Sequence, residues 1–497
     1  MKSFLLYVAV VASLGGFLFG FDSGVISGAE GAIQSEFSLT PFWHGLIISG
    51  ALIGTLIGVF TAGRPSDRFG RRPVLWGMAV LFLISAVGCA FTPTSQTYGP
   101  HLLGWFRFIG GLAIGGVSVV VPLYIVEVSP GRLRGRLVAL NQLNIVFGIL
   151  ISYVSNYFVA RWMVDPNGWF TSLCTSLANV FASHPMSVEM VKWRVMLGME
   201  CLPIVLFMLL LTTIPESPRW LVRVGRRRDA EDVLNRIGFC EDGKTVAVVA
   251  DEIEESLRGV ASGAASPALF QRRYLKPILL AFFIAFFNQV SGINAINYYA
   301  PRIFAMIFGE GSEIAALVGT MGLGAVNLVF TLLAFLVIDR FGRRAMIIGG
   351  SLLMIVMHGL VAWQLSRPAP NATIAVCGIL GFIAFFACSS GAVIWVYISE
   401  VFPNAVRAKG QALGCFTHWF LCTVISWAFP VVAERAGTWA FGFFAFMMLC
   451  QLVWATFFMP ETKGGTTEDI EKRLGIETGR EVNFRRKREQ EESRKDR

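Results

Sequence analysis

The sequence predicts an all-α protein that crosses a membrane about twelve times, with its helices in two bundles of six. Three observations predict this fold class: the composition, the long apolar runs and an internal repeat. Of the 497 residues, 55% are hydrophobic and 15% are charged, whereas a soluble protein carries roughly a quarter charged residues. A run of about 20 apolar residues can span a bilayer as a helix. A membrane barrel would instead need short segments of alternating polarity.

The apolar runs give the predicted membrane spans directly. They lie near residues 4–28, 45–63, 74–92, 101–125, 137–158, 195–214, 276–303, 314–337, 346–364, 373–400, 410–432 and 437–459.

Basic residues gather in alternate loops between these spans, after the second, fourth, sixth, eighth and tenth. Examples are Arg71, Arg134, Arg226, Arg343 and Arg407. Loops rich in Lys and Arg stay in the cytoplasm, so we expect a multi-pass protein of the cell membrane with both termini cytoplasmic. The net charge of +9 follows from this asymmetry, and we expect no nucleic-acid partner.

The internal repeat divides the chain into halves. The segment DRFGRR occurs at 67–72 and again at 339–344, and two further echoes follow in the same order. Glu-Val-Ser-Pro at 127–130 matches Glu-Val-Phe-Pro at 400–403, and Pro-Glu closes both the sixth and the twelfth span. Repeated transporter halves show such internal symmetry. We therefore predict one bundle over 1–215, cytoplasmic linker helices over 216–272, a second bundle over 273–460 and a charged cytoplasmic tail over 461–497.

The repeated segments also carry matched charges at the cytoplasmic ends of the spans. Carboxylates and arginines at one face can form ion pairs between helices, and a network of them can bias a two-state equilibrium. The alternative is that the arginines only set topology. The candidate gating residues are Asp67, Arg71, Glu127, Arg134, Glu216, Arg219, Asp339, Arg343, Glu400, Arg407 and Glu461.

A carboxylate lies well inside the first span, at Asp22. An ionisable group in a membrane span is costly, so it must face the protein interior and be paired or protonated. The buried cation Arg107 in the fourth span is its expected partner. Protonation of Asp22 would release Arg107, which permits proton coupling; a static structural pair is the alternative.

Taken together, these motifs resemble the sugar porter family of the major facilitator superfamily. The matching stretches are 63–72, Glu127-Val-Ser-Pro with Arg134-Gly-Arg, Pro215-Glu-Ser-Pro-Arg-Trp-Leu, Asn288-Gln-Val-Ser-Gly-Ile-Asn and Pro460-Glu-Thr-Lys-Gly. The stretches Asn141-Gln-Leu-Asn and Glu200-Cys-Leu-Pro are similar to bacterial proton–xylose symporters of that family. The resemblance implies proton-coupling roles for Asp22 and Arg107, and for Glu200 as a further acid.

The resemblance also implies a sugar site built from polar residues inside the spans. Neutral amides suit sugar hydroxyls because they both donate and accept hydrogen bonds. The expected substrate-binding residues are Gln142, Asn288, Gln289, Asn294, Asn327, Trp395, His418 and Trp419. Gln289 and Asn294 would converge only if Ser291 and Gly292 break the helix. Asn288 stands where relatives carry Gln, and His418 stands where relatives carry Gln or Asn. The alternative for the amides is a role in packing helices together.

The expected function is therefore the import of a pentose or hexose with protons by alternating access. A passive facilitator is the alternative, and a sugar sensor that does not transport is a weaker one. The sequence shows no catalytic triad and no phosphate-binding loop, so we do not expect an enzyme. We also expect no catalytic residue, no metal-binding residue and no cofactor. The expected partners are the monosaccharide, protons and the lipid bilayer, and we expect the protein to work as a monomer.

Overall fold

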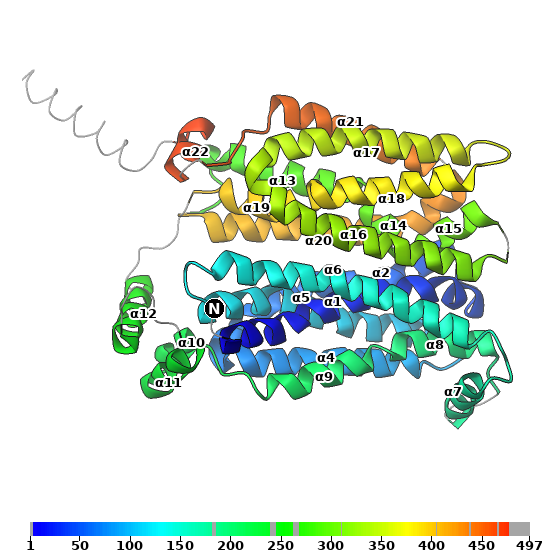
Figure 1. Cartoon of the computed structure of the whole chain (residues 1–497), viewed down its shortest axis with the longest axis horizontal. Helices are drawn as coiled ribbons and strands as arrows, with labels where there is room; N and C mark the ends of the chain where they lie inside the picture. The colour runs from blue at the N-terminus through cyan, green and yellow to red at the C-terminus, as the bar shows by residue number, and fades with distance from the viewer. Residues whose placement is uncertain are drawn as a thin grey trace, which may run out of the picture.

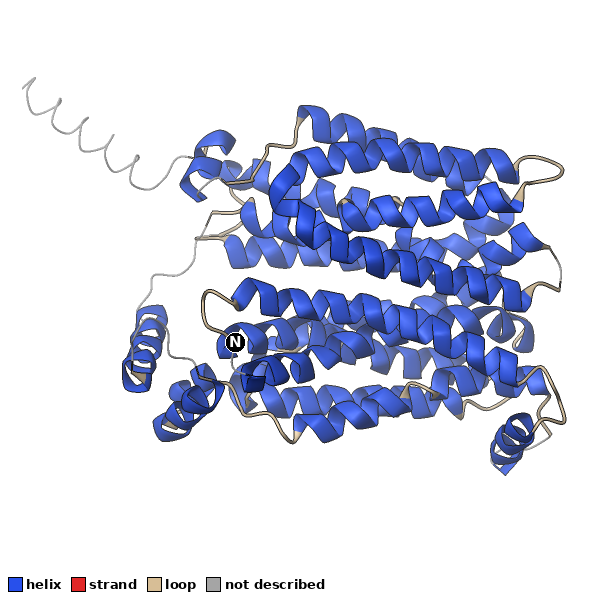
Figure 2. Ribbon diagram, in the orientation of Figure 1, coloured by secondary structure: helices blue, strands red, loops and turns tan. Residues whose placement is uncertain are grey.

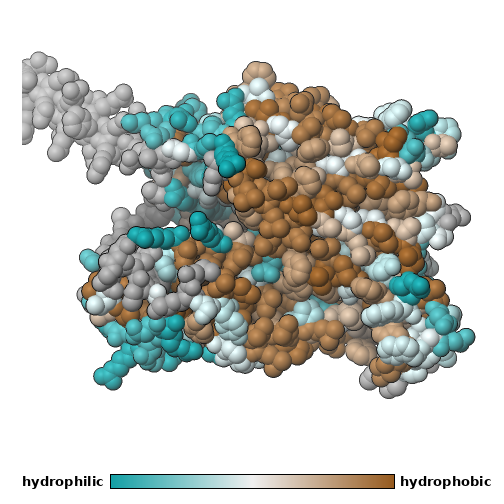
Figure 3. Space-filling model, in the orientation of Figure 1, coloured by the Kyte–Doolittle hydropathy of each residue, from teal (hydrophilic) through white to brown (hydrophobic). Residues whose placement is uncertain are grey.

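The computed structural model describes residues 3–180, 185–238, 245–261, 268–309, 311–403, 405–436, 439–464 and 467–476. All regular secondary structure in these ranges is helical (Figure 2). Twelve helical segments are long and apolar enough to cross a membrane, as the apolar runs predict. On the face drawn in Figure 3, hydrophobic residues cover the middle of the molecule and polar residues lie toward its two ends.

The first six spans form one bundle. They are α1 (Ser3–Glu36), α2 (Pro41–Thr61), α4 (Arg71–Ala90), α5 (Gly99–Val128), α6 (Arg134–Trp162) and the pair α8 (Val188–Gly198) and α9 (Cys201–Leu211). The sixth span is thus interrupted next to Glu200. Pro203 has no N–H to continue the helical hydrogen bonds at this point.

The last six spans form the second bundle, in which two of the spans are broken. They are α13 (Leu275–Val290) with α14 (Ile293–Tyr298), α16 (Glu313–Phe341), α17 (Arg343–Leu365), α18 (Ala372–Cys388) with α19 (Ser390–Glu400), α20 (Arg407–Ala436) and α21 (Trp439–Phe457). The seventh span breaks at Ser291 and Gly292, as predicted, and Gly292 has a φ of 87°. Glycine adopts this left-handed conformation at little cost.

Short helices lie at both ends of the bundles (Figure 1). The linker helices α10 (Pro218–Arg223), α11 (Arg227–Ile237) and α12 (Val246–Ala261) lie near the N-terminus, at what we call the linker end. The apolar face of α11, formed by Ala230, Val233, Leu234 and Ile237, is buried in the core of the first bundle. The amphipathic helix α7 (Trp169–Val180) lies at the opposite end, and the sequence analysis did not anticipate it.

Three further short helices complete the described chain: α3 (Gly63–Phe69), α15 (Ala300–Phe308) and α22 (Thr467–Leu474), with a 3₁₀ turn at Arg272–Tyr274. The repeated hexapeptide makes the same sharp turn in both halves. Gly70 and Gly342 have φ values of 102° and 88°, which explains why each copy of the repeat needs a glycine there.

Candidate functional site

A cavity of about 170 Å³ lies between the two bundles and contains most of the predicted sugar-binding residues. Its walls come from both halves: α1, α2 and α6 on one side, and α13, α14, α19 and α20 on the other. The predicted residues that line it are Gln142, Asn288, Gln289, Asn294, Trp395, His418 and Trp419. Transporter sites lie at such interfaces between repeats, close to broken helices.

The break in the seventh span brings the predicted amides together. The Asn294 amide donates to Gln289 Oε1 at 2.6 Å, although the two residues lie on different helices. Gln289 Nε2 in turn lies 3.1 Å from Asn288 Oδ1 and 3.0 Å from His418 Nδ1. The amides therefore bind one another, and each of these contacts can be exchanged for a hydroxyl group of a ligand.

Gln142, on the opposite wall, faces the cavity without a partner. It lines the cavity from α6, and its amide makes no hydrogen bond within the described parts of the chain. Both its donor and its acceptor are thus available to a ligand.

Aromatic rings close the cavity on the side of the second bundle. The rings of Trp395 and His418 lie 4.8 Å apart, and those of His418 and Trp419 lie 5.2 Å apart. Trp419 also contacts Phe19 of the first bundle at 5.5 Å. Indole faces suit the C–H faces of a sugar, while the amides suit its hydroxyls.

Asn327 does not join this group. It is absent from the cavity wall, and its amide oxygen accepts a hydrogen bond from Thr331 within α16 at 3.4 Å. The cavity instead includes Ser23, Asn297 and Tyr298, which the sequence analysis missed. The signal for two of them was present, because Asn297 and Tyr298 lie one helical turn beyond Asn294 on the same broken span.

The charged pair predicted inside the first bundle is present. Arg107 Nη1 donates to Asp22 Oδ1 at 2.5 Å, and the two side chains are 1% and 2% exposed. Glu200, at the break of the sixth span, is also buried and interacts electrostatically with both. Asp22 and Glu200 interact through their side chains, and two nitrogens of Arg107 have no hydrogen-bond partner within the described residues. Asp22 is adjacent in sequence to the cavity residue Ser23.

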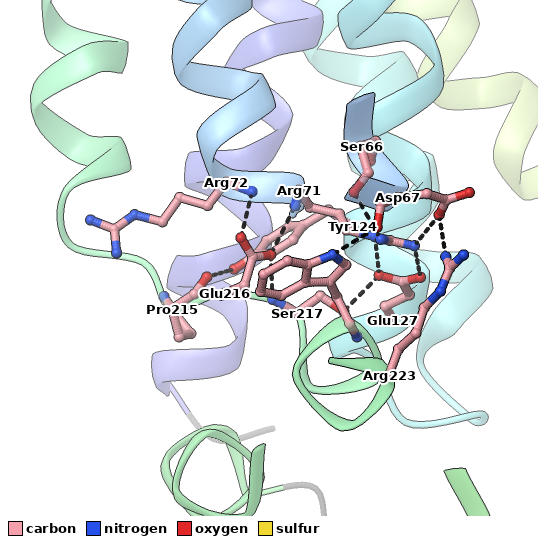
Figure 4. A network of polar contacts seen from close by, with 11 residues as sticks. Ser66, Asp67, Arg71, Arg72, Tyr124, Glu127, Pro215, Glu216, Ser217 and Arg223 are labelled. Atoms are coloured by element: carbon pink, nitrogen blue, oxygen red, sulfur yellow. Dashed lines mark hydrogen bonds and ion pairs between the residues drawn. The ribbon is translucent and has the colours of Figure 1, made fainter. Parts of the chain in front are cut away.

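Most of the predicted gating residues of the first half form a compact network at the linker end (Figure 4). Arg71 donates to Glu127 at 2.8 Å and to Asp67 at 3.3 Å. Glu216 accepts from the backbone N–H groups of Arg71 and Arg72 at 3.0 and 3.1 Å. It thereby satisfies the first N–H groups of α4. Burial raises the pKa of Glu216, although these N–H donors oppose the shift.

The second half repeats this arrangement. Arg343 donates to Glu400 at 3.0 Å, and Glu461 accepts from the backbone N–H groups of Arg343 and Arg344 at 2.9 Å each. Burial would raise the pKa of Glu461, but the backbone N–H donors outweigh it and the pKa is lowered. The Pro-Glu motifs thus supply a carboxylate that caps the helix after each repeated hexapeptide.

Two of the predicted members, Arg134 and Arg219, take no part in these networks within the described residues. Both are exposed, and neither pairs with a carboxylate in the described ranges. Arg407 donates to the carbonyl oxygen of Phe402 at 3.4 Å. The side chain of Asp339 lies outside what the structure describes.

Comparison with known proteins places the chain in a family. The sequence model of the sugar (and other) transporter family matches residues 8–474. The chain belongs to this family. It is 36% identical over 499 residues to the D-xylose-proton symporter of Escherichia coli strain K12, covering 95% of this chain and 96% of the symporter. It is also 36% identical over 472 residues to the arabinose-proton symporter of Bacillus subtilis strain 168, covering 94% and 95%.

Solved structures agree on the fold. The inward-open conformation of the xylose transporter XylE from E. coli superposes with a TM-score of 0.79 at 32% identity, covering 94% of this chain and 99% of XylE. The protein is therefore a transporter of the major facilitator fold and not an enzyme. The described residues contain no cluster of His, Cys, Asp or Glu that could hold a metal ion.

Proposed function

We propose that this protein imports a monosaccharide, a pentose or a hexose, together with a proton. The observation that carries the proposal is the buried Asp22–Arg107–Glu200 cluster beside a cavity between two bundles that several amide side chains line. The sugar and the proton thus occupy neighbouring sites in one chain. The names of the related xylose and arabinose symporters support the same substrate class.

Counting charges explains why the cluster takes a proton. Two ionised carboxyl groups and one guanidinium would leave a net charge of −1 in a fully buried site, and an uncompensated buried charge is costly. One proton balances the cluster. When that proton is lost, Asp22 and Glu200 compete for Arg107. Arg107 lies on α5, so a movement of α5 relative to Asp22 or Glu200 changes the affinity of the cluster for a proton. Proton binding is thereby linked to the conformation of the protein.

Sugar bound in the cavity would act on the same conformational equilibrium, because the cavity is next to the proton-binding cluster. Asp22 lies beside Ser23 on the cavity wall, and Tyr298 lines the cavity while interacting electrostatically with Asp22 and Arg107. A sugar that draws Asn294 and Gln142 together brings the two bundles together across the cavity. Both ligands then bias a single rearrangement, which is the requirement for symport.

The orientation in the membrane follows from the distribution of basic residues. Arg71, Arg343 and the Arg-rich start of α11 lie at the linker end, and segments rich in Lys and Arg stay inside the cell. We therefore assign the linker end and both termini to the cytoplasm. The Arg71–Glu127 and Arg343–Glu400 pairs would hold each bundle rigid at this face. Each chain contains a complete pathway, so a monomer suffices.

The test is uptake into proteoliposomes that contain the purified protein. Labelled xylose should accumulate when a proton-motive force, acidic outside, is imposed, and should only equilibrate when the force is collapsed by a protonophore. Competition by other pentoses, hexoses and inositols identifies the preferred sugar. Equal uptake with and without the force would indicate a passive facilitator, and absence of any sugar uptake would overturn the proposal.

A further inference from the structure

A buried charged cluster at the end opposite the linker connects the two bundles. Glu30, near the end of α1, has a side chain that is only 4% exposed. It contacts Arg302 of α15 twice, with Arg302 Nε 3.1 Å from Oε1 and Nη2 3.0 Å from Oε2. Arg302 also donates to Gln34, one turn further along α1. One guanidinium from the second bundle is thus held by two residues of the first.

The position of Glu30 is fixed from within its own bundle. His44 of α2 is fully buried, and its Nε2 lies 2.9 Å from Glu30 Oε2. Within the described residues, His44 Nδ1 has no hydrogen-bond partner. Because a carboxylate oxygen accepts, His44 donates to Glu30 from Nε2.

A second ion pair crosses between the bundles at the same end. Lys192 of α8 lies 2.7 Å from Glu313, at the start of α16. It also lies 2.7 Å from Glu189 on its own helix. The lysine side chain is 8% exposed, whereas Glu313 and Glu189 are 54% and 70% exposed. This lysine therefore has one partner in each bundle.

The helices α2 and α20 also pack closely at this end. Trp427 Nε1 of α20 donates to the carbonyl oxygen of Phe42 at 3.2 Å. A methyl group on Gly45 would clash with the carbonyl oxygen of Trp427. Three separate pairs of helices are thus in direct contact between the bundles. By contrast, the Arg71–Glu127 and Arg343–Glu400 pairs at the linker end each lie within one bundle.

We infer that Arg302 with Glu30 and Gln34, and Lys192 with Glu313, form an outer latch. The latch holds the cavity closed toward the outside and must break before sugar can enter from that side. The inference rests on the proposed alternating access. Hydrogen bonds of about 3 Å cannot persist when the two bundles separate at this end. The residues that form these bonds are therefore part of the outer gate. Loss of the latch shifts the population toward the outward-open state.

Spin-label distances between the outer loops test this directly. Nitroxides at Thr97 and Ala369, which are exposed and lie in outer loops of opposite bundles, report the separation of the bundles in the absence of sugar. We expect Glu313→Gln and Arg302→Gln to increase the population with long distances. Glu189→Gln is the matched control, since it removes the partner of Lys192 within its own bundle and should leave the distances unchanged.

The second experiment exchanges the charges of Lys192 and Glu313. Lys192→Glu should open the outer end, and Lys192→Glu combined with Glu313→Lys should restore the short distances. Easier access from outside should also lower the KM for external sugar by about two- to fivefold in Glu313→Gln, the range expected for an ion pair of this exposure. Identical distance distributions in the wild type, Glu313→Gln and Arg302→Gln would overturn the latch. The distance measurement needs no sugar, so it fails independently of the proposed transport function.

Discussion

Replacing Asp22 with Asn should abolish proton-driven accumulation of sugar while leaving sugar binding intact, and the size of the loss can be calculated. The substitution keeps the size of the side chain but removes one carboxyl group from the buried cluster. Glu200 and Arg107 remain, and their charges balance without a bound proton. The sugar cavity keeps all of its predicted ligands, because Asp22 itself does not line it. We therefore expect the variant to bind and exchange sugar but to lose proton-driven accumulation.

The size of the loss follows from the energy in the proton gradient. A single charge crossing a potential of 100 mV is worth about 2.3 kcal/mol, and about 1.4 kcal/mol is a factor of ten. One coupled proton thus supports roughly 40-fold accumulation of sugar for every 100 mV, and the variant should fall to no accumulation. The assay is uptake of labelled sugar under an imposed proton-motive force, with counterflow as the measure of exchange.

The control for this experiment is Asp229→Asn, the same chemical change at an exposed carboxylate of α11. It should accumulate sugar as the wild type does. If Asp22→Asn still concentrated sugar to the wild-type level, the assignment of Asp22 as the coupling acid would be refuted. If it lost both accumulation and counterflow while remaining folded, Asp22 would be part of the sugar site instead.

Four further outcomes are expected. Gln289→Ala leaves Asn294 without its partner, and an orphaned polar group costs about 1–3 kcal/mol, so calorimetry should show affinity for sugar about 5- to 150-fold weaker. Asn327→Ala should leave that affinity within about twofold, because the residue does not line the cavity. Gly292→Ala forces a side chain into a left-handed conformation and should destabilise the protein by about 1–3 kcal/mol in thermal unfolding. The lowered pKa of Glu461 means that its stabilisation is present above a pH of 4.5 and is lost as the pH falls through the lowered value. Glu461→Gln should therefore flatten the acid side of the stability profile below pH 4.5, and an unchanged profile would contradict this.

Much of the architecture was predictable because its determinants are local. Long apolar runs identify membrane helices whatever their neighbours, and a carboxylate within such a run must find an interior partner. Arg107 was the expected partner of Asp22 because it is a cation within another apolar run. Similarly, the break at Ser291 and Gly292 was predictable, since Gln289 and Asn294 could not otherwise face one cavity.

The outer latch depends on long-range packing, and the sequence analysis missed it. The first span was expected to end near residue 28, whereas α1 continues to Glu36. Glu30 and Gln34 therefore lie on a rigid helix that faces Arg302. Their partner Arg302 lies 272 and 268 residues further along the chain, on α15, so no local pattern identifies the contact. The position of Asn327 depends in the same way on how α16 is rotated, which an apolar run does not define.

The most direct test of the central claim is the movement of protons that accompanies the sugar. Proteoliposomes or cells in a weakly buffered medium, with no imposed gradient, should make the medium more alkaline when the preferred sugar is added. The account predicts about one proton taken up for each sugar molecule, and no pH change in Asp22→Asn. Sugar entry without any alkalinisation in the wild type would contradict it.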